Sequence, residues 1–244
     1  MAEPLTLYVI HGSHPCASVE AGLRTKGLAY DTVYLQFGLS QFTQTARFGK
    51  RTVPGLTVGI QKASGSRLIL RALDGLSAQA PLLPADPELR GAVDEADLWG
   101  DEVLQHQVRW IAVDAIRREP SVALAYGSKS APPLPDAAIP GATRALFTTE
   151  MRLLGQTAER VRDEYVPALA EHLDHVDGLI ADGVLGGEQV NVADCQVAGS
   201  IRLLQTFEDL REGIDARPCG ALARRLCPQY DGSMPRGVID APVL

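Results

Sequence analysis

The first 35 residues contain a strand, a helix and a second strand, and this order restricts the fold more than any other feature of the sequence. Residues 5–10 form a short apolar run, which is typical of a buried strand. Cys16, Val19 and Leu23 then fall on one face of a helix, and residues 30–35 return to a strand pattern. Because a connection of this length contains a helix, we expect the two strands to be parallel.

The next 40 residues complete a small α/β unit. Residues 36–50 are polar and weakly patterned, and they fit either an irregular helix or a loop. Residues 53–58 form a strand with a proline near its start, and residues 60–63 are expected to pair with it as an antiparallel strand. A helix from Ser66 follows the turn, and Gly75 ends it. The predicted order is therefore β-α-β-(α)-β-β-α.

The character of the chain changes after this unit. Three prolines among small residues mark a linker at residues 79–87. We predict an α/β domain over residues 1–78 and an all-α domain over residues 88–244.

Helical patterns dominate the second half. Residues 89–115 predict one long amphipathic helix, and residues 146–179 predict another. Asn191 and Asp194 have the spacing of a capping box, so we expect Asp194 to be structural and to start a central helix. The segment from Gln229 is rich in Gly and Pro and is expected to lie over the surface.

Composition limits the possible partners. The chain has 244 residues, 45% of them hydrophobic, and a net charge of -7, so we expect no nucleic-acid partner. The first apolar run is too short for a signal peptide or a membrane span, so we expect a cytoplasmic protein. The four cysteines are scattered, which favours free thiols, and no metal constellation is present.

Two stretches carry the chemistry that we expect. Ser13-His14-Pro15-Cys16 lies where a strand leads into a helix, and the free amides and dipole of such a helix end favour an anion or a thiolate. Val53-Pro54 lies where a cis peptide is inexpensive. A cis bond there would turn the Val53 backbone outward, beside that helix end.

Together these features resemble the glutathione S-transferase superfamily, in which a thioredoxin-like N-terminal domain precedes an all-helical domain. The element order, Val53-Pro54, Ser66 twelve positions later and the Asn191/Asp194 pair carry the resemblance. The first domain is also similar to glutaredoxins. There, Ser13 stands where a C-x-x-C motif has its first cysteine, and Cys16 stands where it has its second.

The resemblance implies that glutathione is the co-substrate. Val53 backbone groups, next to Pro54, would pair with its cysteinyl unit, and Ser66 would hold its γ-glutamyl carboxylate. Arg51, or its neighbour Arg47 or Lys50, would meet its glycyl carboxylate, unless the three belong to a solvated loop. Trp110, together with Trp99 and His106, would border the pocket for a small electrophile unless these aromatics are core. The resemblance also implies a homodimer.

Two departures from the family pattern affect this interpretation. Gly65 replaces the acidic or amide residue that usually precedes the serine, so a partner for the γ-glutamyl amine is missing. Ser13 replaces a nucleophilic cysteine, which argues against a dithiol reductase.

Each residue of the first stretch has a structural alternative. Ser13 either stabilises the thiolate of glutathione or is a helix cap, and the two roles are compatible. Cys16 is either a buried small side chain or a reactive thiol. His14 is expected to be exposed, although it could line the substrate side or tune Cys16.

Three functional hypotheses follow. The first is a glutathione S-transferase-like enzyme that activates the glutathione thiol for attack on a small apolar electrophile. The second is a glutaredoxin-like thiol-disulfide reductase that works through Cys16. The third is a non-catalytic binding module with the same fold.

Overall fold

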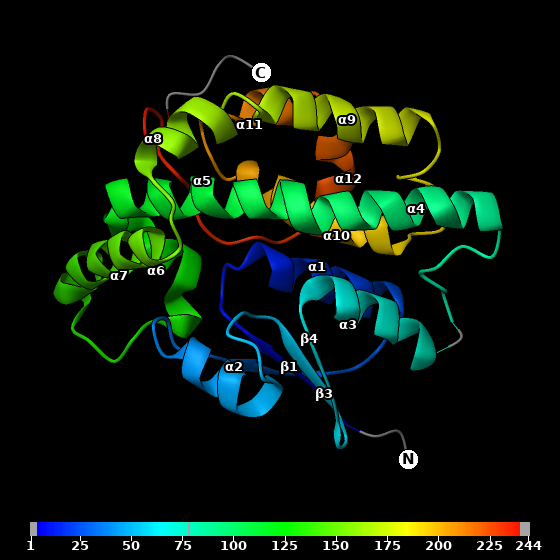
Figure 1. Ribbon diagram of the computed structural model, residues 1–244, viewed down its shortest axis with the longest axis horizontal. Coiled ribbons are helices and arrows are strands. Elements are labelled where there is room, and N and C mark those ends of the chain that lie inside the picture. The colour runs from blue at the N-terminus through cyan, green and yellow to red at the C-terminus, as the bar shows by residue number, and fades with distance from the viewer. Residues whose placement is uncertain (1–3, 78, 240–244) are drawn as a thin grey trace.

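The computed structural model describes residues 4–77 and 79–239, and its N-terminal part has the predicted order (Figure 1). The stretch at residues 36–50 contains a regular helix. The elements are β1 (Leu5–Val9), α1 (His14–Thr25), β2 (Asp31–Tyr34), α2 (Ser40–Phe48), β3 (Gly55–Val58), β4 (Gln61–Ser64), α3 (Ser66–Ala72) and η1 (Leu73–Gly75).

One mixed sheet, with strand order β2-β1-β3-β4, organises this part of the chain. As predicted, β1 and β2 are parallel, and β4 is antiparallel to β3. Tyr8 at the end of β1 pairs with Gly55 at the start of β3, and Gly55 pairs with Ser64 at the end of β4. The segments that contain Ser13, Val53-Pro54 and Ser66 therefore leave the sheet at the same end.

The second half is helical, as predicted, and most of it lies on the side of the sheet that α1 and α3 cover (Figure 1). Its elements are α4 (Pro87–Trp99), η2 (Gly100–Leu104), α5 (Gln105–Arg118), η3 (Pro120–Val122), α6 (Ala123–Gly127), η4 (Ser128–Ser130), η5 (Asp136–Ala138), α7 (Ile139–Leu153), α8 (Ala158–Arg160), η6 (Val161–Tyr165), α9 (Leu169–Ala181), α10 (Val192–Leu204), α11 (Arg211–Asp215) and α12 (Pro218–Leu226).

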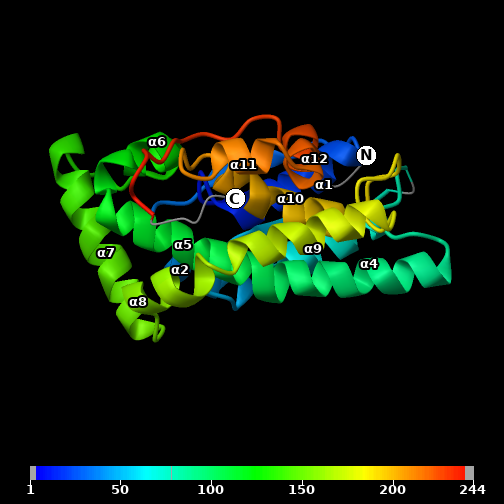
Figure 2. The same cartoon turned by 90° about the horizontal axis from the view of Figure 1, so that it is seen from above.

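Two helix predictions have different outcomes. The long helix is present, because α4, the π-helical turn η2 and α5 follow one another without a break (Figure 2). The prediction of one helix over residues 146–179 is wrong. The chain turns after α7, where Gly155 adopts a φ of +66° that a helix cannot contain, and the helical path resumes at α8.

Helix α10 is the centre of the packing, as the capping box predicted. All its residues except Arg202 are buried, and it contacts α1, α4 and α12. Gly199 permits the approach of α1, because a Cβ there would lie 2.4 Å from the carbonyl oxygen of His14. The start of α1 is therefore held directly against the core of the helical half.

The C-terminal segment is more than a surface covering. Met234 is fully buried and pairs with Phe207, and Ile239 is also buried. The expectation of a superficial tail was therefore wrong for these residues, whose apolar side chains join the core.

The hydrophobic core runs through both halves of the described chain. The predicted domain division stays a prediction, and its limits at residues 1, 78 and 244 lie outside the described residues. None of the helices in the described ranges combines the length and apolar character needed to cross a bilayer.

Candidate functional site

Ser13 occupies the N-cap position of α1, but its side chain makes no capping hydrogen bond. Its hydroxyl lies instead within hydrogen-bonding reach of the Cys16 sulfur. In the first turn, Pro15 has no amide hydrogen and the Cys16 amide donates to the Ser13 carbonyl at 3.1 Å. The Ser13 hydroxyl therefore faces a weak partner that a better acceptor can replace.

Cys16 is 3% exposed. Burial raises the pKa of its thiol to about 12, although the Ser13 hydroxyl opposes that rise. Because only the thiolate is a nucleophile, the Cys16 side chain is inert at neutral pH. The structure favours the buried small side chain among the two alternatives for this residue.

His14 is buried, with 3% of its surface exposed, so the expectation of an exposed histidine was wrong. The close packing of α1 on α10 causes this burial. Burial first, and the charge of Arg109 second, lower the pKa of His14 to about 3. Among the described residues, its Nδ1 atom has no hydrogen-bond partner. His14 is therefore neutral at physiological pH.

The Val53-Pro54 peptide is cis, as predicted. The Pro54 carbonyl accepts the Gly65 amide at 3.0 Å, which ties this turn to the start of α3. The Val53 amide and carbonyl have no hydrogen-bond partner within the described ranges. Arg51 lies on the exposed side of the turn and donates to Gln41 at 2.6 Å.

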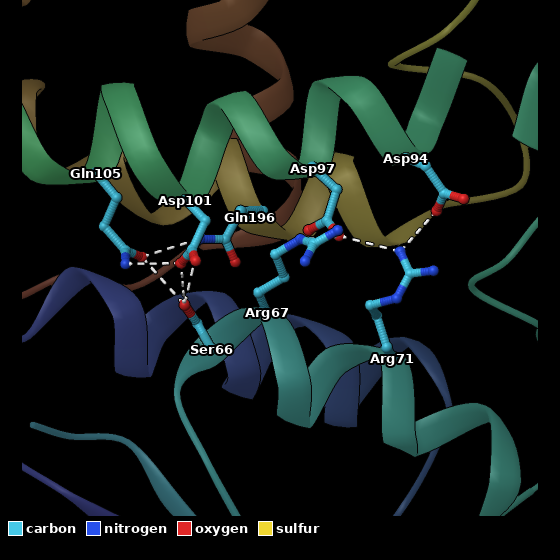
Figure 3. Close-up of polar contacts among 8 residues, drawn as sticks. All are labelled: Ser66, Arg67, Arg71, Asp94, Asp97, Asp101, Gln105 and Gln196. Carbon is cyan, nitrogen blue, oxygen red and sulfur yellow. Dashed lines mark hydrogen bonds and ion pairs between the residues drawn. The ribbon is translucent and has the colours of Figure 1, made fainter. Parts of the chain in front are cut away.

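A polar cluster surrounds Ser66 at the start of α3 (Figure 3). Its hydroxyl lies 3.1 Å from Gln105 Oε1 and 3.5 Å from Asp101 Oδ1. The Gln196 amide nitrogen donates to Ser66 Oγ at 3.2 Å and to Asp101 Oδ1 at 3.1 Å. Ser66, Asp101, Gln105 and Gln196 form what we call the Ser66 cluster, which joins α3 to three elements of the helical half.

Asp101 is the only anionic side chain in the Ser66 cluster. It lies in η2, and Gln105 one turn later donates to it at 3.1 Å. Burial raises the pKa of Asp101, and the nearby Arg67 charge opposes that rise. Arg67 and Arg71 pair with the buried Asp97 (Figure 3). These ion pairs hold α3 against α4 and so fix the place of Asp101.

Sequence reasoning missed Asp101, Gln105 and Gln196. Asp101 and Gln105 are four residues apart on a predicted helix, so their shared face was visible. Nothing in the sequence indicated that this face meets Ser66, because the contact spans 35 residues to Asp101 and 130 residues to Gln196.

The aromatic residues predicted to border the pocket lie along the long helix, Trp99 in α4 and Trp110 with His106 in α5. Trp99 packs against His172 and His175 of α9. The Trp110 ring is 3% exposed and lies under the Arg109 guanidinium. These contacts place Trp99 in the helical half, away from the sheet end, and the substrate contact of Trp110 stays a prediction.

Comparisons with known proteins concern the N-terminal part of the sequence and the fold. Residues 7–81 match the family model described as glutathione S-transferase, N-terminal domain. No curated protein matches the sequence.

Solved structures match nearly the whole chain. A Tau class glutathione S-transferase from mango (Mangifera indica) has a TM-score of 0.62 at 14% identity, over 97% of this chain and 90% of that one. A glutathione S-transferase from Sinorhizobium meliloti has a TM-score of 0.62 at 15% identity, covering 97% and 95%.

A theta class enzyme from Xanthomonas axonopodis pv. citri, solved with glutathione bound, has a TM-score of 0.55 at 16% identity, covering 93% and 99% of the two chains. These likenesses show a shared fold, and the N-terminal match shows the sequence signature of that fold's first domain. The described chain therefore has the fold of glutathione S-transferases, and residues 7–81 match the N-terminal domain of that family.

Proposed function

We propose that this protein is an enzyme that binds glutathione and activates its thiol for attack on a small apolar electrophile. The observation that carries the proposal is the meeting of Ser13, the unpaired Val53 backbone and the Ser66 cluster at one end of the sheet. Glutathione offers a thiol, a peptide group and a charged γ-glutamyl end. The Ser13 hydroxyl would serve the thiol, the unpaired Val53 backbone the peptide group, and the Ser66 cluster, with its anionic Asp101, the γ-glutamyl end.

The γ-glutamyl end fits the Ser66 cluster. This end has an ammonium group and a carboxylate, so it needs an acceptor with negative charge and a hydroxyl or amide donor. Gly65 supplies no side chain, but the Asp101 carboxylate lies 3.5 Å from Ser66 Oγ. We propose that Asp101 accepts the ammonium group and that Ser66 and the Gln196 amide donate to the carboxylate.

The cysteinyl unit fits the Val53 turn. Its peptide group would pair with the Val53 amide and carbonyl in the manner of an added strand, which directs its sulfur toward α1. Arg51 is on the same turn and would leave Gln41 for the glycyl carboxylate.

Ser13 performs the activation in this scheme. Its hydroxyl would turn from Cys16 to donate to the glutathione sulfur, and the dipole of α1 adds about 0.3–1 kcal/mol in favour of the thiolate. The thiolate then forms a bond to an electrophilic carbon, and the leaving group departs with its electron pair. Before this attack the thiol loses its proton to solvent, and the hydrogen bond from Ser13 favours that loss by stabilising the thiolate.

The reductase hypothesis loses its support, because the Cys16 thiol stays protonated at neutral pH.

Resemblance to the superfamily also supports a homodimer in the cytoplasm. Light scattering of the purified protein tests the dimer, and imaging of a tagged copy in its host tests the compartment.

A calorimetric titration with glutathione tests the proposal. The wild-type protein is expected to bind at millimolar concentration or below. Asp101→Asn is expected to weaken binding about tenfold, because it removes the charge that faces the ammonium group. Asp94→Asn is the matched control, since Asp94 lies upstream on the same long helix, in α4, and pairs with Arg71. Absence of binding to the wild-type protein, or equal effects of the two variants, would contradict the proposal.

A further inference from the structure

The turn that carries Ser13 is held by residues more than 200 positions away. The Tyr230 hydroxyl donates to the Gly12 carbonyl at 2.7 Å. His11 Nε2 lies 2.9 Å from the Asp231 carboxylate. Tyr230 and Asp231 of the C-terminal segment therefore bind Gly12 and His11, the two residues that precede Ser13.

The other side of the turn packs against residues 126–130. Gly12 has a φ of +79°, and a Cβ there would lie 2.3 Å from the Tyr126 carbonyl oxygen of α6. The His11 amide donates to Ser130 Oγ at 2.8 Å, and the Lys129 amide donates to His11 Nδ1 at 3.4 Å. With Nδ1 as acceptor, Nε2 carries the proton and donates to Asp231. The turn thus has no room to move away from Tyr230.

The segment that contains Tyr230 and Asp231 is itself held by hydrogen bonds and packing. We call residues 228–239 the C-terminal strap. The Met234 amide donates to the Thr206 carbonyl at 2.9 Å, and the Glu208 amide donates to the Met234 carbonyl at 3.0 Å. Gly232 lies on the Tyr126 ring, since a Cβ there would be 2.4 Å from a ring carbon. The strap is therefore fixed at Met234 by the turn that follows α10.

Tyr230 is suited to a permanent donor role. Burial raises the pKa of its phenol well above the ordinary value, so the hydroxyl keeps its proton throughout the physiological range. The Gly12 carbonyl that it holds belongs to the peptide bond leading into Ser13. Rotation of that peptide would redirect the Ser13 side chain.

We propose that Tyr230 is a positioning residue, which fixes the Gly12-Ser13 peptide and so directs the Ser13 hydroxyl toward the thiol of the bound substrate. Asp231 supports it through His11. This inference rests on the proposed function. It makes thiol activation depend on the C-terminal strap as well as on the α/β part of the chain.

Tyr230→Phe and Tyr126→Phe form a matched pair for the test. Both remove one phenol hydroxyl with one short hydrogen bond, but the Tyr126 hydroxyl meets Thr206 at 2.6 Å and does not touch the turn. Amide hydrogen exchange of residues 11–13 and steady-state kinetics with glutathione and an activated aryl halide are measured on both full-length variants.

Tyr230→Phe is expected to speed exchange at Gly12 and Ser13 and to lower kcat about tenfold, with the KM for glutathione within about twofold of wild type. Tyr126→Phe is expected to change neither quantity. A merely structural role of Tyr230 would lower the melting temperature of Tyr230→Phe and leave its kcat and its KM for glutathione at the wild-type values.

The two levels of the proposal fail in different ways. If the wild-type protein does not bind glutathione, the proposed function is overturned, and the role of Tyr230 with it. If Tyr230→Phe binds glutathione and shows wild-type exchange and kcat, only the positioning role is overturned.

Discussion

The N-termini of α10 and α1 both have a polar residue at the N-cap, and they use it in opposite ways. At α10, Asn191 Oδ1 accepts the Asp194 amide at 3.0 Å, and the Asp194 carboxylate accepts the Asn191 amide at 2.9 Å. At α1, the Ser13 hydroxyl makes no capping bond. The first terminus satisfies its own amides and stabilises the fold, whereas the second leaves the Ser13 hydroxyl beside the Cys16 sulfur.

The buried carboxylate of Asp194 makes the α10 terminus the larger contributor to stability. It accepts the amides of Gly186 at 2.7 Å and of Asn191. Asp194→Ala leaves both amides unpaired, that of Asn191 in the core, and we expect the free energy of unfolding to fall by about 3 kcal/mol. Urea denaturation measures this loss. Asp194→Asn retains an acceptor and should lose about half as much, so equal losses would contradict the capping account.

A pH dependence tests the buried side of the α1 terminus, where His14 lies. An unfolded histidine has a pKa of about 6.5, whereas that of folded His14 is lowered to about 3. Between these values the unfolded chain binds a proton that the folded chain does not. Stability therefore falls as the pH falls through this range.

His14→Gln cannot titrate, so it should lose less stability than wild type on acidification, by up to about 1.4 kcal/mol per pH unit. Urea midpoints near neutral pH and about two pH units lower measure the difference. His106 and His172 are present in both proteins, so their contributions cancel. Parallel losses in the two proteins would show that His14 is not held neutral.

The smallest effect on stability is expected at Ser13. Because its hydroxyl does not cap α1, Ser13→Ala should change the free energy of unfolding by less than about 0.5 kcal/mol, against about 1–2 kcal/mol for Asn191→Ala. Thermal or urea denaturation of the two variants side by side measures both. A loss at Ser13 as large as that at Asn191 would mean that Ser13 is a structural cap.

Local patterns predicted most of the fold. The capping box was readable because Asn191 and Asp194 are three residues apart, and the element order followed from short apolar runs and their turns. The helix break at Gly155 could not be predicted, since the apolar spacing continues across it. A glycine with positive φ is visible only in the structure.

The positions of the candidate site residues were also predicted in part, where local patterns determine them. Ser13 and Ser66 lie shortly after strands and Val53 shortly before one, so their shared place at one end of the sheet could be predicted. Asp101 and Gln196 reach Ser66 through the packing of α4 and α10 on α3, which no local pattern encodes. The burial of His14 likewise depends on Gly199, far along the chain.

The central claim is that Ser13 stabilises the thiolate of bound glutathione. Titration of the thiolate absorbance of the bound peptide, in the wild-type protein and in Ser13→Ala, tests it most directly. We expect the thiol pKa in the wild-type complex to lie about one unit below that of free glutathione and to return most of the way in Ser13→Ala. The same thiol pKa in both complexes would contradict the account.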